Sequence, residues 1–275
     1  MEAKVTLLII LANAIFSFIG FNNTNFLYKY MFRVGDVLYK KEFIRILSSG
    51  FLHVDFMHLT FNMLTLYFFG SFLEINVGLP IYQYLLLYFA CLIGGNLLAL
   101  ILNKNKANYA AVGASGAVTG VLFATIVYQP NLTLGIFFII PMPAWVYGIA
   151  FILFSIYGIN KKSGNIGHEA HLGGAIVGSL AMLAIYPFLL ERNLWVVLGI
   201  IFPTILFLFI ALKFPHLLQF NFKKKTRTSE YELDENYAIE KQLNEDKMNR
   251  ILEKIHDYGI DSLTEEEQRF LRNKK

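Results

Sequence analysis

Seven long apolar segments, separated by short polar breaks, dominate the order of hydrophobic and polar positions along the chain. The breaks carry charged residues, glycine, proline or asparagine, as at residues 103–106 and 161–165. A helix that crosses a membrane needs roughly 20 mostly apolar residues, and fewer where protein buries its ends. The sequence therefore predicts an all-α protein, a polytopic bundle of transmembrane helices. The seven predicted spans are residues 5–21, 57–73, 82–102, 113–129, 142–159, 168–189 and 194–212.

The first span and two connecting stretches need separate interpretation. Residues 12–14 (Ala-Asn-Ala) resemble a signal-peptidase site, but the apolar run continues through Phe21, so we expect an uncleaved helix. Residues 22–56 mix Phe, Tyr and Leu with charged side chains, which favours an amphipathic loop in the membrane interface. Residues 130–143 are apolar but bracketed by prolines, which favours a membrane-hugging loop over a full span.

Composition indicates a membrane body followed by a charged tail. Apolar residues make up 56% of the 275 positions and charged residues 16%, against about 25% charged in soluble domains. Residues 223–275 hold 12 of the 24 basic and 13 of the 20 acidic residues. The net charge of +4 is small and no basic stretch is interleaved with aromatic side chains, which excludes a nucleic-acid partner. Cys91 is the single cysteine, so no internal disulfide can form.

The tail after Phe222 has the pattern of a small helical appendage. Its apolar residues stand close to helical spacing, and Thr264 with Glu267 forms a capping-box pattern ahead of a second short helix. The apolar positions are Ile239, Leu243, Ile251, Leu252 and Ile255, with Phe270 and Leu271 in the second helix. We expect a non-catalytic hairpin or partner-docking element, whose partner the sequence does not name.

Three clusters of polar residues interrupt the apolar spans. Polar groups are costly in hydrocarbon, so those inside spans usually face the bundle interior and serve a purpose. The clusters are His53 with His58 and Asn62 at the start of the second span, Gly113-Ala114-Ser115-Gly116 at the start of the fourth, and His171 with Gly174 and Gly178 along the sixth.

Each cluster alone also has an ordinary explanation. His58 and Asn62 share one helix face and could be hydrogen-bonding residues between helices. A G-x-S-G sequence is common by chance among the small residues of helix contacts, and His171 alone could be a packed or proton-relay histidine. The combination of the three clusters therefore decides the interpretation.

The combination supplies the parts that peptide hydrolysis needs, namely a nucleophile, a base and donors for an oxyanion. Ser115, His171 and the pair His58 and Asn62 fill these roles. A serine at the start of a helix also keeps a backbone N–H free to point at an oxyanion. Glycines on the fourth and sixth spans would let the two backbones approach closely enough to bring His171 to Ser115.

A zinc site is the nearest competing chemistry, because His168-Glu169-Ala170-His171 resembles a zinc motif. Two zinc-ligating histidines on one helix stand four residues apart, as in H-E-x-x-H, whereas these stand three apart. The sequence therefore predicts no metal and no cofactor.

Taken in order, these residues resemble the rhomboid family of intramembrane serine proteases, over roughly residues 42–187. Position 44 departs from the pattern, since it is Ile where relatives often carry Trp, which affects loop packing and not the dyad. The matching positions are Glu42 to Arg45, Phe51-Leu52-His53, His58, Asn62, Glu74, Gly113-Ala114-Ser115-Gly116, and Ala170-His171-Leu172-Gly173-Gly174 with Gly178.

The resemblance implies a Ser–His dyad without a third acidic member, in a water-accessible cavity with a gate for an unwinding transmembrane substrate. It assigns Ser115 as nucleophile and His171 as general base and acid, with His58, Asn62 and the Ser115 N–H as the oxyanion site. Residues expected to give structural support are His53, Arg45, Gly113, Gly116, Gly174 and Gly178.

The resemblance also implies a division of the chain. Residues 1–190 would form the six-span catalytic core, residues 191–222 a seventh span with its flank, and residues 223–275 the tail. Membrane orientation stays open. The family usually places the N-terminus in the cytoplasm, whereas nine basic residues in loops 22–56, 103–112 and 160–167 favour the opposite orientation by the positive-inside rule.

The predicted function is an intramembrane serine endopeptidase that hydrolyses peptide bonds in or near transmembrane helices. Its expected partners are single-pass or polytopic membrane-protein substrates and the lipid bilayer. A non-catalytic adaptor would lack the serine or the histidine, and a transporter would place charges or broken helices near mid-membrane in repeated halves. A compact chain without a targeting extension favours a bacterial plasma membrane.

Overall fold

The computed structural model describes residues 3–136, 140–161 and 167–213, and in the C-terminal part residues 248, 251–256, 258–264, 267–268 and 271. The chain forms two compact units, residues 1–220 and residues 221–275. The predicted boundary between residues 222 and 223 lies outside the described residues.

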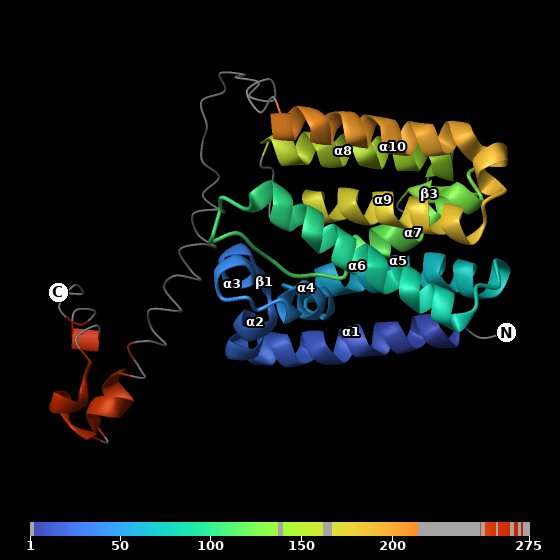
Figure 1. Cartoon of the computed structure of the whole chain (residues 1–275). Helices are drawn as coiled ribbons and strands as arrows, with labels where there is room; N and C mark the ends of the chain where they lie inside the picture. The colour runs from blue at the N-terminus through green and yellow to red at the C-terminus, as the bar shows by residue number, and fades with distance from the viewer. Residues whose placement is uncertain are drawn as a thin grey trace. The chain divides into compact units, whose positions relative to one another are not determined.

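The first unit is a bundle of long helices that lie side by side (Figure 1). In Figure 1, α1 lies along one side of the bundle, α8 and α10 lie along the opposite side, and the remaining long helices fill the space between. These helices are α1 (Lys4–Asn22), α5 (Phe56–Ser71), α6 (Ile81–Asn103), α7 (Ser115–Tyr128), α8 (Ala144–Lys161), α9 (His168–Ile185) and α10 (Leu189–Lys213).

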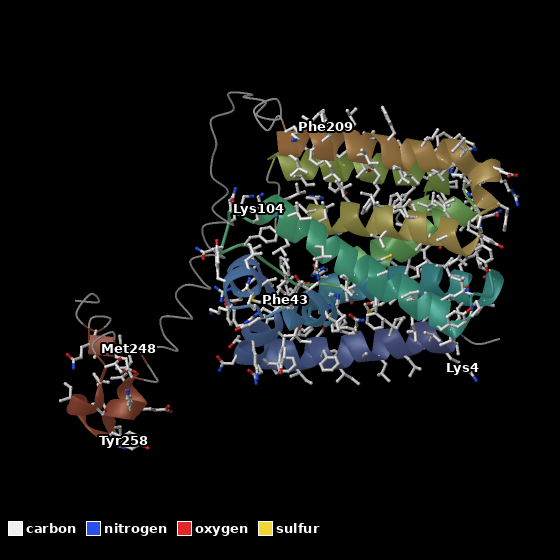
Figure 2. All side chains as sticks on the ribbon, in the orientation of Figure 1. Lys4, Phe43, Lys104, Phe209, Met248 and Tyr258 are labelled. Atoms are coloured by element: carbon white, nitrogen blue, oxygen red, sulfur yellow. The ribbon has the colours of Figure 1, made fainter. Side chains whose placement is uncertain are left out.

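Among the described residues, five helices are long and apolar enough to cross a membrane. They are α1, α5 with the turn that continues it to Asn76, α6, α9 and α10. The helices α7 and α8 are apolar but shorter. All seven predicted segments therefore coincide with helices, and the prediction of a multi-pass helical membrane protein is confirmed. Large apolar side chains such as Leu8 on α1 and Phe202 on α10 are exposed. Phe209 of α10 is also exposed and lies on the outside of the bundle (Figure 2). Exposed apolar side chains on the outer helices are what contact with lipid tails requires.

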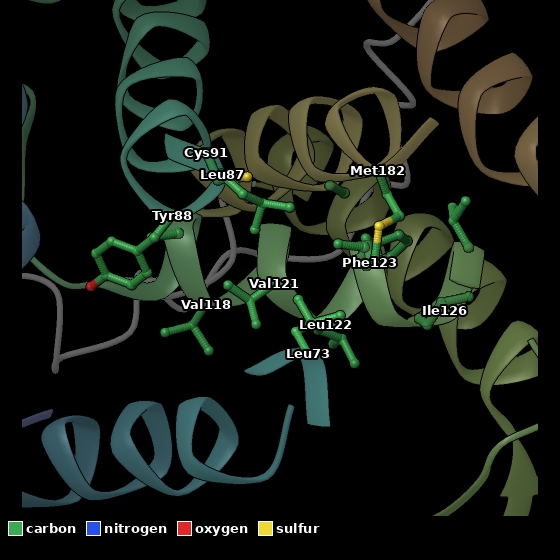
Figure 3. Packing of buried hydrophobic residues seen from close by; sticks show 14 of the residues in the cluster. Leu73, Leu87, Tyr88, Cys91, Val118, Val121, Leu122, Phe123, Ile126 and Met182 are labelled. Atoms are coloured by element: carbon green, nitrogen blue, oxygen red, sulfur yellow. The ribbon is translucent and has the colours of Figure 1, made fainter. Parts of the chain in front are cut away.

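Helix α7 lies at the centre of the bundle, and every residue from Gly116 to Val127 is buried. A helix that is apolar on all sides can be stable only where protein or lipid surrounds it. Here the surroundings are protein. Val118, Val121 and Phe123 lie in one packed cluster with Tyr88 and Cys91 of α6 and Met182 of α9 (Figure 3).

Two pairs of glycines set the distance between α7 and α9. A Cβ on Gly174 would overlap the carbonyl oxygen of Gly116, and a Cβ on Gly178 would overlap the carbonyl oxygen of Gly120. Because no side chain separates the backbones at these two levels, α7 and α9 approach as closely as small-residue contacts between membrane helices allow.

An ion-pair cluster organises the connection between α1 and α5. Arg45 is buried and donates to the backbone carbonyls of Tyr28 and Met31, and also pairs with Glu42 and Asp36. Burial alone would raise the pKa of Asp36, but three neighbouring cations outweigh it and hold the pKa below its ordinary value. The connection is therefore a folded unit, with elements α2 (Thr24–Tyr30), β1 (Phe32–Arg33), α3 (Val34–Tyr39), α4 (Ile44–Ser48) and η1 (Ser49–Phe51).

Short strands modify the prediction of an all-α fold, since the structure is mostly helical and not wholly so. Strand β1 pairs antiparallel with β2 (Ala110–Ala111), which ties the first connection to the segment before α7. The stretch predicted as a plain membrane-hugging loop contains a hairpin of β3 (Thr133–Ile136) and β4 (Ile140–Pro143).

The end of α5 stabilises the start of α1. After Ser71 the helix continues as a π-helical turn, Phe72–Asn76, which carries Glu74. The Glu74 carboxylate accepts from the backbone N–H groups of Val5 and Thr6 and from the Thr6 hydroxyl. Since Ala3 has no side chain that could cap α1, the carboxylate of Glu74 performs that role and suits the positive end of the helix dipole.

The second unit contains the predicted capping box. Glu267 N–H donates to the Thr264 hydroxyl, and the Glu267 carboxylate accepts from the Thr264 N–H and hydroxyl. The same carboxylate pairs with Lys254 at 2.8 Å, and these bonds lower the pKa of Glu267 to about 2. Ile251 and Leu263 are buried, whereas Leu252 is exposed. The tail positions Ile239, Leu243 and Phe270 lie outside the described residues.

Candidate active site

Ser115 is the first residue of α7, and a turn at Gly113 directly precedes this helix. Gly113 has φ +133°, a conformation that side chains disfavour, and its N–H donates to the Ser49 carbonyl at 3.0 Å. Ser115 itself is half-buried. The N–H groups of a first helical turn have no acceptor within the helix, so the serine combines a hydroxyl with a backbone donor at one point.

The neighbours of Ser115 and His171 are in contact. A Cβ on Gly116 would lie 3.3 Å from the carbonyl oxygen of Ala170 and 3.6 Å from its Cβ. Gly116 follows Ser115 in α7, and Ala170 precedes His171 in α9. The fold therefore brings the fourth and sixth predicted spans together at the level of the two predicted catalytic residues, 56 positions apart in the printed sequence.

The ring of His58 borders the same turn. A Cβ on Gly113 would lie 2.8 Å from Cε1 and 3.0 Å from Nε2 of His58, and 3.7 Å from Oγ of Ser115. Because Gly113 has no side chain, the edge of the His58 imidazole and the Ser115 hydroxyl can both lie beside this position. His58 stands in the first turn of α5, where its N–H donates to the capping carboxylate of Asp55 at 2.7 Å.

Asn62 lies one turn after His58 on α5 and is buried. Its amide N–H donates to the His58 carbonyl at 3.0 Å. The side chain is therefore held against its own helix, on the face that also carries His58.

His53 connects three elements through a chain of hydrogen bonds. The Ala114 N–H donates to its Nε2 at 3.4 Å, and its Nδ1 lies 2.8 Å from the Ser17 hydroxyl, which donates to the Phe51 carbonyl. This pattern assigns the proton of a neutral imidazole to Nδ1. Burial, aided by His58 and opposed by Asp55, lowers the pKa of His53 to about 3. His53 therefore holds the residue before Ser115 as a neutral acceptor.

Aromatic side chains of α8 and α9 pack against His171, the predicted base. Phe151 of α8 lies 5.6 Å from the His171 ring between centroids, and His168 lies 5.9 Å from it. His53 and His58 form a similar edge contact at 4.9 Å. His168 packs against Phe154 and Gly158 of α8.

Within the described part of the chain, no three His, Cys, Asp or Glu side chains gather in a way that could hold a metal ion.

The structure leaves Arg45 away from this cluster, since its bonds hold the first connection. It also reveals polar residues that the sequence interpretation passed over. Ser17 supports His53, Asn13 donates to Tyr88, and Asn96 donates to the Ile46 carbonyl. Their signal was available, because each is a polar side chain inside an apolar span.

Comparison with known proteins links this arrangement to one family. Residues 40–188 match the family described as the rhomboid domain. The chain is 36% identical over 152 residues to RHOMBOID-like protein 12, mitochondrial, of Arabidopsis thaliana, which covers 50% of this chain and 44% of that protein. It is 36% identical over 161 residues to Rhomboid protein 1, mitochondrial, of Saccharomyces cerevisiae, covering 56% and 45%. It is 28% identical over 166 residues to Rhomboid protease GluP of Bacillus subtilis, covering 60% and 31%.

The matched stretch spans less than half of each of these relatives. Two of these relatives carry mitochondrial names and the third comes from Bacillus subtilis, so they do not point to one membrane. The comparisons therefore do not support the expected bacterial plasma membrane. Residues 231–273, in the tail, match a family of unknown function (DUF6576).

Proposed function

Since the chain belongs to the rhomboid family, we propose that it is an intramembrane serine endopeptidase with Ser115 as nucleophile and His171 as general base and acid. The observation that carries the proposal is the contact of Gly116 with Ala170, which brings the helix that starts at Ser115 against the helix that bears His171. A nucleophile and its base need hydrogen-bond reach, and the close approach of α7 and α9 at this level supports the assignment.

In the proposed reaction, His171 takes the proton of the Ser115 hydroxyl while Oγ attacks the scissile carbonyl carbon. The C–N bond then breaks, His171 returns the proton to the leaving amine, and the acyl group stays on Ser115. His171 then takes a proton from water as the water oxygen attacks the ester carbon. The bond to Ser115 Oγ breaks, His171 gives its proton to Oγ, and the carboxylic product leaves. The chemistry requires only the two side chains, peptide and water.

The oxyanion of each tetrahedral intermediate needs donors aimed at one point. The Ser115 N–H, the His58 imidazole and the Asn62 amide are the proposed donors. The contacts around Gly113 support this choice, because the His58 ring and Ser115 Oγ both lie beside that residue. Removal of one such donor typically costs about 100-fold in kcat.

The proposed substrates are transmembrane helices of other membrane proteins, cut near a helix end at small residues that helix-weakening residues follow. The multi-pass fold supports a substrate that arrives from the lipid. A backbone inside a helix is hydrogen-bonded, so the segment has to unwind before Oγ can attack its carbonyl. Membrane-protein substrates and the lipid bilayer are thus the proposed partners.

The test is cleavage of a model transmembrane substrate by the full chain purified in detergent. Wild type should cut, and Ser115→Ala and His171→Ala should fall to background while they keep the wild-type melting temperature. The matched controls are Ser179→Ala, a buried serine on α9 whose hydroxyl donates to the Ala175 carbonyl, and His256→Ala in the tail. Both should cut normally. Cleavage that survives in Ser115→Ala would contradict the mechanism.

A further inference from the structure

A hydrogen-bond network surrounds Glu169, two residues before the predicted base. Asn103 Nδ2 donates to Oε1 of Glu169 at 3.0 Å, and the Tyr109 hydroxyl donates to Oε2 at 3.3 Å. Lys106 Nζ donates to Oδ1 of Asn103 at 2.7 Å, so both ends of the Asn103 amide are hydrogen-bonded. The Asn103 amide and the Tyr109 hydroxyl therefore each direct a donor at the Glu169 carboxylate, and hydrogen bonds to a carboxylate are stronger than those between neutral groups.

The network joins three parts of the bundle. Asn103 ends α6, Tyr109 belongs to the segment between α6 and α7, and Glu169 stands in the first turn of α9. An acid in that turn also suits the positive end of the helix dipole. Burial and the adjacent carboxylate raise the pKa of Tyr109, which keeps its hydroxyl protonated as a donor.

The segment that holds Tyr109 is the one that delivers Ser115. The Tyr109 carbonyl accepts from the Val34 N–H, its ring packs on Phe32, and β2 follows directly and pairs with β1. The turn at Gly113 and the start of α7 come next. A carboxylate on α9 therefore holds the chain six residues before Ser115, and it stands two residues before His171.

We propose that Glu169 is a positioning residue, whose bonds to Tyr109 and Asn103 fix the separation of Ser115 from His171. The inference rests on the proposed protease function. The glycine contacts of α7 and α9 set how closely the helices approach, whereas the Glu169 bonds fix the start of α9 against the segment that enters α7. A displacement of about 1 Å at a reacting pair can cost on the order of 100-fold in rate, so such a tie bears on catalysis.

The experiment compares full-length variants in detergent by three readouts. These are kcat and KM on a model transmembrane substrate, the rate of Ser115 labelling by a fluorophosphonate, and the melting temperature. In the labelling step Oγ bonds to phosphorus, fluoride leaves and His171 takes the proton, so the rate reports the dyad without substrate docking. The matched control is Glu191→Ala, an exposed acid in the first turn of α10.

Glu169→Ala should lower kcat and the labelling rate about tenfold, which corresponds to the loss of bonds to a charged acceptor, with KM unchanged. Tyr109→Phe removes one donor and should lower both about threefold. Glu169→Gln keeps an acceptor for Asn103 and can donate to the Tyr109 oxygen, so it should return both rates close to wild type. Glu191→Ala should behave as wild type.

Wild-type kcat and labelling in Glu169→Ala, beside an inactive Ser115→Ala, would overturn the positioning role and leave the protease function intact. A loss that follows a lowered melting temperature and that Glu169→Gln shares would also overturn it, since the role would then be stability alone. If the wild type neither cuts nor labels, the proposed function itself fails, and the inference fails with it.

Discussion

Gly178 of α9 lies so close to Gly120 of α7 that a Cβ on Gly178 would overlap the Gly120 carbonyl oxygen, carbon and Cα. Backbone atoms cannot move aside as the end of a side chain can. Gly178→Ala should therefore separate the two helices and lower the melting temperature, with a cost of about 1–3 kcal/mol or more. Gly167→Ala is the control, because its Cβ would meet only the Ala170 Cβ at 3.8 Å. Equal melting temperatures for the two variants would contradict the close approach.

The proposed oxyanion donors, His58 and Asn62, can be tested separately from the proposed dyad. His58→Ala and Asn62→Ala should each lower kcat by about 100-fold, with little change in KM, since the oxyanion exists only after attack. Single-turnover cleavage measures this effect directly. Asn62 already donates to the His58 carbonyl, so an Asn62→Ala effect on KM and melting temperature with kcat unchanged would assign it to helix structure instead.

The hydrogen-bond chain through His53 makes stability depend on pH. The folded-state pKa of His53 is lowered to about 3, below the ordinary 6.5, so the unfolded chain binds the proton more readily. The contribution is fully present above pH 6.5 and is lost as pH falls toward 3, on the order of 2 kcal/mol at pH 5. The melting temperature of wild type should therefore fall more between pH 7 and pH 5 than that of His53→Gln. Parallel curves would show that His53 does not titrate in this way.

Arg45 should stabilise the connection between α1 and α5 through the geometry of its hydrogen bonds as well as through its charge. Arg45→Ala leaves the buried Asp36 without one cation and two carbonyls without their donor, and should destabilise the protein by about 3 kcal/mol. Arg45→Lys keeps the charge but cannot reproduce the forked bonds, so it should recover only part of the loss. Lys29→Ala, an exposed cation on α2, is the control for both in thermal unfolding. Full recovery in Arg45→Lys would mean that charge alone holds the connection.

The sequence predicts the helices well because lipid demands long apolar runs, and each such run became a helix. It predicts the hairpin of β3 and β4 poorly, since proline-bracketed apolar residues have no clear period. The close contact of α7 with α9 followed from the spacing of glycines. The bonds of Ser17 with His53 and of Tyr109 with Glu169 did not, because residues 36 and 60 positions apart meet only once the helices are packed.

The enclosed position of α7 has a consequence for biogenesis. Its 14 residues rise about 21 Å, short of the roughly 30 Å of hydrocarbon in a bilayer. Inserted alone, α7 would leave backbone groups of its flanking segments in lipid without partners. It therefore has to enter together with α6 and α9, whose side chains surround it. The helix that starts at Ser115 is thus placed only when the rest of the bundle assembles.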